Sequence, residues 1–509
     1  MTQRSDGSAT LLAGAVEWRF GAGLLEAELE HSRQSQPSTP GFSLLGSQLP
    51  DANGVDPRLN LNNQPWSLPV VLRGDTGSLR YTHNIADKTQ LVAHLMQQTL
   101  KSDDRIAFPF GCSAENDYTR YCSDGSFDVY DFRSEGERRS SRAADLSLVA
   151  DTTIAGLRHK LRAGVLATRY AARYGRQAYN WVGVGTVDGN TVVPADPTLT
   201  DENTNRDERS TEWHLQDAVT LAPAWQLWAG LRHTRLQRNS VRTDGSRATA
   251  YTQSFSTPWL ALAWQATAQT LAYASWGQGI ESEVAPNRLR YSNAGQALPA
   301  LKSRQLEAGL KHRSEAWAWQ LAAFDIQRPA WNDIQASTGL PSDACSDSDP
   351  CTRRADGSAR HRGLEAEVEW NSGPWSLRAG ALALQARREG SANATSNGLR
   401  PTNVPERSLK LQGVYNVSAL PGLALLGFAS HEGARMVLPD NSIATPGWTR
   451  VDLGLRQAQQ LAGAKLVWRL GVDNVFDERA WKEAPYQYGH AYLYPLQPRT
   501  WRASLNIAL

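Results

Sequence analysis

The sequence predicts an all-β fold, specifically a transmembrane antiparallel β-barrel. Three observations lead to this prediction: many segments alternate between apolar and polar residues, short and long connections follow one another in strict turn, and the chain closes on an apolar residue in mid-strand. Side chains alternate between the two faces of a strand, so an alternating segment gives one face to lipid and the other to a polar lumen. A soluble sheet has no reason to place all its long connections on one side.

The closing segment carries this alternation most clearly. Trp501, Leu505 and Leu509 share one face with Ala503 and Ile507, whereas Arg502, Ser504 and Asn506 share the other. We therefore expect residues 495–509 to form the last strand of the barrel.

The same pattern recurs along the whole chain and predicts about nineteen strands, many longer than globular strands. The expected strands are residues 8–20, 23–34, 69–84, 88–105, 136–154, 157–174, 207–222, 224–242, 250–266, 268–283, 300–314, 316–330, 358–372, 374–389, 403–418, 421–436, 447–459, 463–480 and 495–509.

The connections fall into two classes that alternate. Short turns such as residues 21–22 and 85–87 are followed by long polar segments such as 35–68, 106–135, 175–206 and 481–494. In an outer-membrane barrel the short turns face the periplasm and the long loops face outwards. Counted back from the closing strand, this alternation makes the first and last strands run in the same direction.

Composition excludes several other classes. In 509 residues with a formal net charge of +2, no apolar stretch reaches the length of a membrane helix, and the charge does not indicate a nucleic-acid binder. The 18 Trp and 15 Tyr suit interfacial girdles, in which we place Tyr492 and Tyr494. No basic and apolar leader marks an export signal at Met1.

The four cysteines form two couples within predicted long loops, Cys112 with Cys122 and Cys345 with Cys351. Their spacings are wider than zinc ligands prefer, so we expect disulfides made in an oxidising compartment and no metal site. Free thiols are the alternative.

Five segments resemble those of TonB-dependent outer-membrane receptors of the ferric-siderophore type. Residues 298–311 are similar to a strand with the pattern Lys-Ser-x-Gln-x-Glu-x-Gly-x-Lys, and residues 361–368 to the Arg-Gly-x-Glu strand that follows it. Asn403-Val404-Pro405, residues 471–477 (Gly-Val-Asp-Asn-Val-Phe-Asp) and Pro498-Arg499-Thr500 match later motifs in the same order.

Physical roles can be expected for some of these motif residues. Asn474 and Asp477 could cap and bend a strand as it leaves the wall. Gly309 and Gly363 leave room for a side chain or for strong curvature. Charge ladders on the polar wall are expected from Lys302, Arg304, Glu307, Lys311, Arg362 and Glu365.

The resemblance implies a receptor and transporter in the outer membrane of a Gram-negative bacterium, energised through the TonB complex in the complete protein. Complete members are expected to have a signal peptide, a TonB box, a plug domain and about 22 strands. We find none of the first three, so we interpret residues 1–509 as an incomplete barrel domain without its plug, in a chain truncated at its N-terminus. The alternative functions are a passive pore or non-functional remnant and, less favoured, an outer-membrane barrel enzyme.

Ligand contacts are expected from aromatic and cationic residues of the outer loops, because siderophores are iron chelates held by such groups. The candidates are Phe108, Phe110, Trp276, Arg288, Arg290, Tyr291, Tyr486, Tyr488 and His490. The ferric siderophore is the expected ligand, with membrane lipid or lipopolysaccharide as further partners and no nucleic acid. We expect no cofactor and no catalytic residue, since neither G-x-S-x-G nor H-E-x-x-H occurs.

Overall fold

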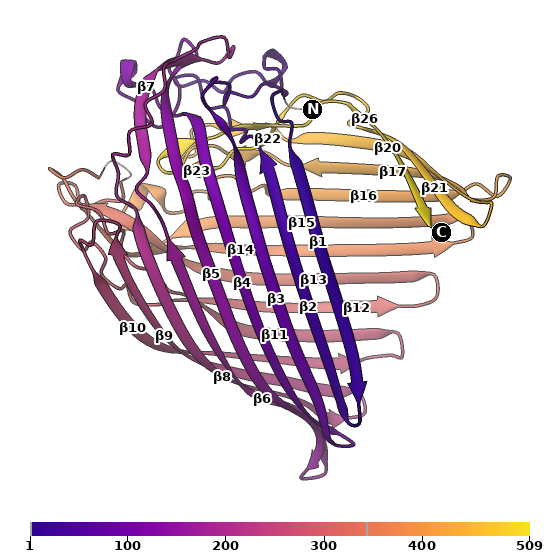
Figure 1. The fold of residues 1–509 in the computed structure, drawn as a ribbon. Helices are drawn as coiled ribbons and strands as arrows, with labels where there is room; N and C mark the ends of the chain where they lie inside the picture. Colours follow the sequence, from indigo (N-terminus) through magenta and orange to yellow (C-terminus); the bar gives the residue numbers. More distant parts are fainter. Residues whose placement is uncertain (1–2, 343–344, 509) are drawn as a thin grey trace.

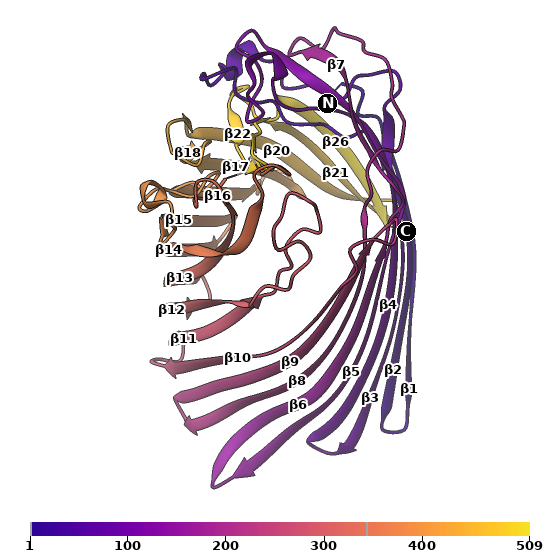
Figure 2. The same cartoon turned by 90° about the vertical axis from the view of Figure 1, so that its left-hand side faces the viewer.

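One long, curved antiparallel sheet forms most of the molecule (Figures 1 and 2). The computed structural model describes residues 3–342 and 345–508. The strands of this sheet are β1 (Ser8–Phe20), β2 (Gly23–Gln36), β3 (Leu68–Ala86), β4 (Thr89–Pro109), β5 (Ser126–Ile154), β6 (Leu157–Arg173), β7 (Ala178–Thr186), β8 (Thr204–Ala222), β9 (Trp225–Arg242), β10 (Thr249–Gln265), β11 (Thr270–Glu281), β12 (Leu301–Arg313), β13 (Trp317–Gln335), β14 (Cys351–Ser372), β15 (Trp375–Glu389), β16 (Arg407–Asn416), β17 (Leu423–Glu432), β20 (Trp448–Leu461), β21 (Ala464–Asp473) and β26 (Thr500–Ala508).

Short elements lie in the long connections. They are the pairs β18 (Arg435–Met436) with β19 (Ala444–Thr445), β22 (Trp481–Glu483) with β25 (Tyr494–Pro495) and β23 (Tyr486–Gln487) with β24 (His490–Ala491), and the 3₁₀ turns η1 (Ala52–Gly54), η2 (Ser113–Glu115) and η3 (Ala394–Ser396). Among the described residues, no helix has the length and apolar character that crossing a membrane requires.

The topology confirms the predicted succession of strands. Without β7, the remaining nineteen of the 20 strands each pair with the next along the chain, always antiparallel. All long connections emerge at one end of the sheet, the loop end, and all short ones at the other, the turn end (Figure 1). β1 and β26 both run towards the turn end. In the described part of the chain β1 pairs with β2 alone, and β26 with β21 alone. Leu509 lies outside the described residues.

The sequence did not predict β7. This strand pairs with the start of β5 from Ser126 to Arg133, beyond the point where β6 ends. β5 therefore begins ten residues before the predicted residue 136, and β4, β5 and β7 together extend the sheet past its rim. Figure 1 shows this extension among the loops.

The two faces of the sheet differ as the alternation predicts. Leu260, Trp276 and Leu306 are direct cross-strand neighbours on one face and are 47%, 37% and 57% exposed. We call this the apolar face. The opposite, polar face carries side chains that bond to one another, such as Tyr273, whose hydroxyl donates to Glu307 over 2.6 Å.

The expected charge ladders do not all lie on the polar face. Glu307 and Lys311 lie on it. Arg304, however, shares the apolar face with Leu306. Arg362 is also on that face, because it pairs with Asp325, which in turn pairs with Leu306. The prediction grouped residues from odd-numbered and even-numbered positions of a strand, and side chains at these two sets of positions point to opposite faces.

Gly309 and Gly363 make room for aromatic rings on the polar face. Gly309 is the direct partner of Tyr273, and Gly363 of Phe324. A Cβ on Gly309 would lie 2.7 Å from the Tyr273 ring, and one on Gly363 would lie 2.5 Å from the Phe324 ring. Each ring thus lies over the backbone of the neighbouring strand, as predicted.

Asn474 and Asp477 shape the exit from β21, as their motif predicts. Asn474 is 1% exposed at a φ of 51°. Its side chain donates to the carbonyl oxygens of Glu478 and Gln497 over 3.0 and 2.8 Å and accepts from the Glu478 N–H over 2.9 Å. Asp477 accepts from the Arg499 N–H over 2.8 Å. These bonds hold the end of β21 against the start of β26.

Replacing Asn474 with alanine should destabilise this exit by about 2–4 kcal/mol, since it removes three hydrogen bonds and a residue suited to positive φ. Asn474→Gly keeps the backbone conformation, so it should cost less. The free energy of unfolding measured in urea checks both. Phe476→Ala is the control, because Phe476 is 75% exposed. An alanine variant as stable as this control would contradict the assignment.

Candidate functional site

The long loops pack together at the loop end into a small hydrophobic core, which we call the loop cluster. Its buried residues come from both the first and the last parts of the chain: Phe42, Leu44, Leu61, Ala107, Tyr121, Phe127, Val129, Val182, Val193, Val437, Leu438, Trp481, Ala484, Ala491 and Leu493. Burial of these side chains holds loops that are far apart in sequence in one body.

Hydrogen bonds join the same two parts of the chain. Phe42 and Leu493 exchange backbone bonds of 2.9 and 2.7 Å. The Ser43 hydroxyl donates to the Ala491 carbonyl over 2.7 Å, and the Trp481 indole to the Pro50 carbonyl over 2.8 Å. The loop cluster thus connects the loop after β2 with the loop before β26.

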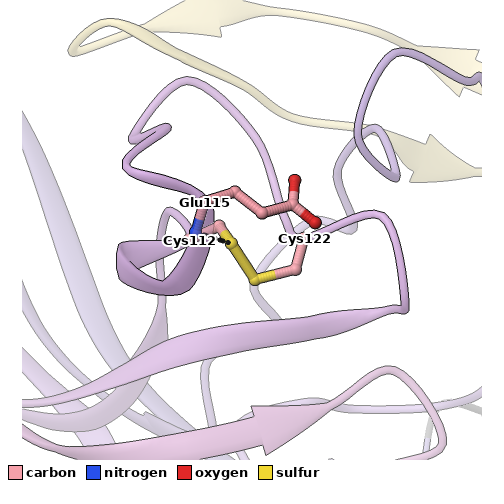
Figure 3. A group of neighbouring side chains, drawn as sticks. All are labelled: Cys112, Glu115 and Cys122. Carbon is pink, nitrogen blue, oxygen red and sulfur yellow. Dashed lines mark hydrogen bonds between the residues drawn. A yellow bond between two sulfur atoms is a disulfide. The ribbon is translucent and has the colours of Figure 1, made fainter.

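A disulfide between Cys112 and Cys122 closes the loop that precedes β5, with their Cα atoms 5.1 Å apart (Figure 3). Glu115 lies beside it and accepts from the Ser123 N–H over 2.8 Å. The three residues have the composition of a metal site. However, the sulfur atoms are bonded to each other, and metal binding requires thiolates.

A second disulfide joins Cys345 to Cys351 at the start of β14. The Cys351 N–H donates to the carbonyl of Arg290 over 2.9 Å. Next to it, the Tyr291 hydroxyl donates to Asp333 over 2.8 Å, and Arg353 makes two bonds to Asp333 over 2.7 and 2.8 Å. Two predicted ligand residues, Arg290 and Tyr291, are therefore held together, with Tyr291 only 7% exposed.

Six aromatic side chains stack at the loop end to form what we call the aromatic cluster: Phe108, Phe110, Tyr130, Tyr179, His490 and Tyr492. The rings of Phe110 and His490 stack with centroids 4.7 Å apart, and those of Tyr130 and Tyr179 with centroids 4.4 Å apart. Tyr492 packs on His490 at 4.6 Å. Offset stacking at these distances is favourable.

The centre of the aromatic cluster holds polar atoms without partners. His490 is fully buried, and neither of its ring nitrogens has a hydrogen-bond partner among the described residues. The Tyr492 hydroxyl is in the same state. Burial lowers the pKa of His490 to about 3 and raises that of Tyr492. The imidazole is therefore neutral at physiological pH.

Acidification should loosen the loop cluster. An unfolded histidine has a pKa near 6.5, so between about pH 6.5 and pH 3 the unfolded loop binds a proton that the folded loop excludes. This contribution to stability is complete above pH 6.5 and falls by about 1.4 kcal/mol for each pH unit below it. Hydrogen exchange of residues 484–494, corrected for intrinsic rates, should quicken at pH 5 relative to pH 7. The same increase in His490→Leu would contradict this explanation.

A pocket of about 440 Å³ opens beside the β23–β24 hairpin. Tyr486, Tyr488 and Gly489 of the hairpin line it together with residues of β13, β14 and β15, including Asn332, Asp333, Asp356 and Arg388. His490 follows on the same hairpin, so this short element carries residues of both the pocket and the aromatic cluster.

The charges around this pocket are unequally satisfied. Asp356 accepts from Asn332, Ser391 and the Ala392 N–H over 3.0, 2.7 and 2.6 Å. Arg388 donates to the Pro439 carbonyl, but its Nε is buried without a partner in the described structure. The guanidinium therefore keeps one unpaired donor, whereas the Asp356 carboxylate accepts three hydrogen bonds.

The predicted ligand residues thus fall into three places. Phe108, Phe110 and His490 meet in the aromatic cluster, and Tyr486 and Tyr488 line the pocket. Tyr291 adjoins the pocket through Asp333, and Arg290 lies over the Tyr291 ring. Arg288, two residues before Arg290, is exposed. Trp276 lies on the apolar face, in the row with Leu260 and Leu306.

Tyr492, Tyr179 and Arg388 were missing from the predicted ligand residues. Tyr492 was placed in a girdle, but it is 6% exposed and packs on Phe108. The girdle prediction for Tyr492 is wrong because its loop folds into the loop cluster instead of following the wall.

Comparison with known proteins adds family information. A family model described as "TonB dependent receptor-like, beta-barrel" matches residues 14–475. The ferrichrome receptor FcuA of Yersinia enterocolitica is 28% identical over 45% of this chain and 29% of its own length. The metal-pseudopaline receptor CntO of Pseudomonas aeruginosa is 23% identical over 99% of this chain and 68% of its own length.

Solved structures share the fold. The ferric preacinetobactin receptor BauA of Acinetobacter baumannii superimposes with a TM-score of 0.83 at 19% identity, over 99% of this chain and 73% of that one. The pyoverdine receptor FpvA of Pseudomonas aeruginosa gives a TM-score of 0.76 at 18% identity, over 99% and 71%.

Proposed function

The chain belongs to the TonB-dependent receptor-like β-barrel family, and from this membership we propose that it receives a ferric siderophore at the outer membrane of a Gram-negative bacterium. The observation that carries the proposal is the sheet itself. One face is apolar enough for lipid, the other is polar, and all the long loops meet at one end around a pocket and an aromatic cluster. The names of the relatives, which are receptors for ferrichrome and metal-pseudopaline, support the same class of ligand.

The pocket beside the β23–β24 hairpin suits a chelate of mixed character. Tyr486 and Tyr488 offer aromatic faces, and Arg388, which lines the same pocket, offers the positive charge of a guanidinium to anionic oxygen. Tyr488 is 89% exposed and can cover a ligand that enters. We assign the first contact with the ligand to these three side chains, with Arg290 and Tyr291 at the border.

The energy for transport, in this proposal, comes from the TonB complex acting on the complete protein, of which this chain provides the barrel domain. Membrane lipid and lipopolysaccharide are its surroundings.

Binding of radioactive iron chelates tests the proposal. Outer membranes carrying the full chain are incubated with a panel of hydroxamate, catecholate and opine-type ferric chelates, and retention is compared with membranes lacking it. We expect one class to be retained, and Tyr488→Ala with Arg388→Gln to weaken that retention at least tenfold. Tyr118→Ala is the matched control, since Tyr118 is a loop tyrosine outside the pocket. The assignment would be refuted if the membranes retained no class of chelate, or if the pocket variant and the Tyr118→Ala control retained the chelate equally.

A passive pore is the second candidate, favoured by the ion-paired polar face. Arg162 lies 3.7 Å from Asp145 and Arg232 lies 3.8 Å from Glu212 along this face. A hydrophilic lining of this kind passes water and ions. Conductance in liposomes that contain the chain and no TonB complex would support the pore.

A further inference from the structure

Cys112, Glu115 and Cys122 bring three atoms of metal-ligand type together in the loop between β4 and β5 (Figure 3). The two sulfur atoms and a carboxylate oxygen all lie within 4.8 Å of one another. Among the residues that the structure describes, no other group of three His, Cys, Asp or Glu side chains gathers its ligand atoms so closely. The disulfide occupies both sulfur atoms in the oxidised chain, whereas a dithiol form leaves them free to bind.

Backbone hydrogen bonds fix both cysteines without help from the disulfide. Cys112 exchanges two backbone bonds with Asp117, of 2.8 and 3.0 Å. The Cys122 N–H donates to the Ser126 carbonyl over 2.9 Å, and the Cys122 carbonyl accepts from the Gly125 N–H over 3.0 Å. The Cα atoms of the two cysteines are 5.1 Å apart. Because these bonds do not involve sulfur, the two thiols of a reduced chain start close together.

Glu115 is available as the third ligand. Its Oε1 accepts from the N–H and the hydroxyl of Ser123, the residue after Cys122, and so the carboxylate is held beside the sulfur atoms (Figure 3). The Glu115 N–H also donates to the Cys112 sulfur over 3.3 Å. Arg120, the cation of this loop, pairs with Asp117 instead, over 3.0 Å. The charge of Glu115 therefore remains available to a bound cation.

We propose that, in the dithiol form, these three side chains bind a divalent cation of the zinc class. Two thiolates and one carboxylate are ligands that zinc accepts, and a site with three protein ligands keeps its fourth position open to water. Thiolates do not suit magnesium or calcium, which prefer oxygen. The inference does not rest on the proposed function, because it concerns a loop disulfide and not the chelate pocket.

The site forms in two balanced steps. A small thiol reductant first supplies two electrons: two of its molecules join as a disulfide, and their two protons pass to the sulfur atoms of Cys112 and Cys122. The cation then replaces these two protons, which go to water, as two metal–sulfur bonds and one metal–oxygen bond form. Since every disulfide begins as two thiols, a newly made chain passes through the form that binds.

The cation closes the same loop as the disulfide. Cys112 and Cys122 begin and end this segment and are 0% and 4% exposed, and Tyr121 beside them belongs to the loop cluster. Metal binding stabilises whichever folded form holds the ligands together. Hydrogen exchange of residues 111–125 should therefore quicken when the disulfide is reduced, and zinc should slow it again.

Cobalt and zinc binding to the full chain in neutral detergent tests the site. The protein is reduced with a phosphine, which takes the oxygen of water while the disulfide takes its two hydrogens, and the phosphine is then removed without air. We expect one cobalt ion per chain with a thiolate-to-cobalt charge-transfer band, and displacement of that ion by zinc. The oxidised chain should show no such band and should bind zinc at least a hundredfold more weakly.

Glu115→Gln tests the oxygen ligand and leaves the disulfide intact. Its reduced form should bind zinc at least tenfold more weakly than the natural chain. Asp124→Asn is the matched control, because Asp124 is an exposed carboxylate of the same loop outside the group of three. Equal zinc affinity of the two variants would remove Glu115 from the site and overturn the proposal.

The second cysteine couple is an internal control for thiols in general. Replacing Cys345 and Cys351 with serine should leave the cobalt band unchanged, whereas replacing Cys112 and Cys122 with serine should abolish it. Loss of the band with the first pair of substitutions, or its survival with the second, overturns the proposal.

The natural chain alone also decides the matter, so the test does not depend on how well any variant folds. Equal zinc binding by the oxidised and reduced chains would show that sulfur is not a ligand, and no binding by the reduced chain would show that no site forms. Either result overturns the proposal. Chelate retention is measured on the oxidised chain, so failure of the metal site and failure of the proposed function are distinguishable.

Discussion

Replacing Gly363 with valine is expected to destabilise the sheet by about 3 kcal/mol or to prevent its assembly. The new Cβ would lie 2.5 Å from the Phe324 ring and 2.7 Å from the Ala383 carbonyl oxygen. The ring can rotate away, but the carbonyl belongs to the ladder between β14 and β15 and cannot. The free energy of unfolding in urea, followed by the heat-dependent shift in gel mobility, measures the effect.

Gly380→Val on the neighbouring strand is the matched control, since a Cβ there meets nothing closer than 3.8 Å. We expect a loss of less than about 1 kcal/mol for it. A double-mutant cycle with Phe324→Ala separates the two contacts, because it relieves the ring and leaves the carbonyl. Equal stability of the two valine variants would show that contacts of the new Cβ with the Phe324 ring and the Ala383 carbonyl oxygen do not determine the stability of this part of the sheet.

Replacing Trp481 with alanine is expected to open the loop cluster at a cost of about 3–5 kcal/mol. Trp481 is 2% exposed, its ring lies 5.7 Å from that of Phe42, and its indole N–H bonds to the Pro50 carbonyl. One side chain therefore carries both the packing and a hydrogen bond between the two parts of the chain. Hydrogen exchange should quicken together in residues 41–49 and 484–494.

Trp501→Ala is the control for this variant, because Trp501 is 78% exposed on β26. It should leave exchange in both loops unchanged. If Trp481→Ala quickened exchange in residues 484–494 alone, the loops would be independent bodies and the loop cluster would not exist as one unit.

The strands of the main sheet were predictable because the alternation of apolar and polar residues is a local pattern. Alternation in a segment such as Ser8–Phe20 or Trp448–Leu461 indicates which residues share a face of the strand, whatever the rest of the chain does. β7 was not predicted because it is short and contains Gly183 and Gly185, and glycines are more typical of loops than of strands. Gly185 is needed there to accommodate Phe127, a contact between strands that no local pattern contains.

The candidate site was predictable only in part, for the same reason. Phe108, Phe110 and His490 could be named because they are aromatic residues in long loops. That they stack on one another depends on the loop before β26 folding back over β4 and β5. Tyr492 and Arg388 acquire their roles from that packing, and composition gives no hint of it.

The loop cluster also sets the order in which the molecule can assemble. Apart from β7, the strands of the sheet pair in chain order, so each connection closes only a short part of the chain. The bond between Ser43 and Ala491 instead joins residues 448 positions apart. A contact between residues so far apart in sequence becomes favourable only after the strands between them have formed and brought the two loops together. The loops around the pocket are therefore expected to fold after the sheet.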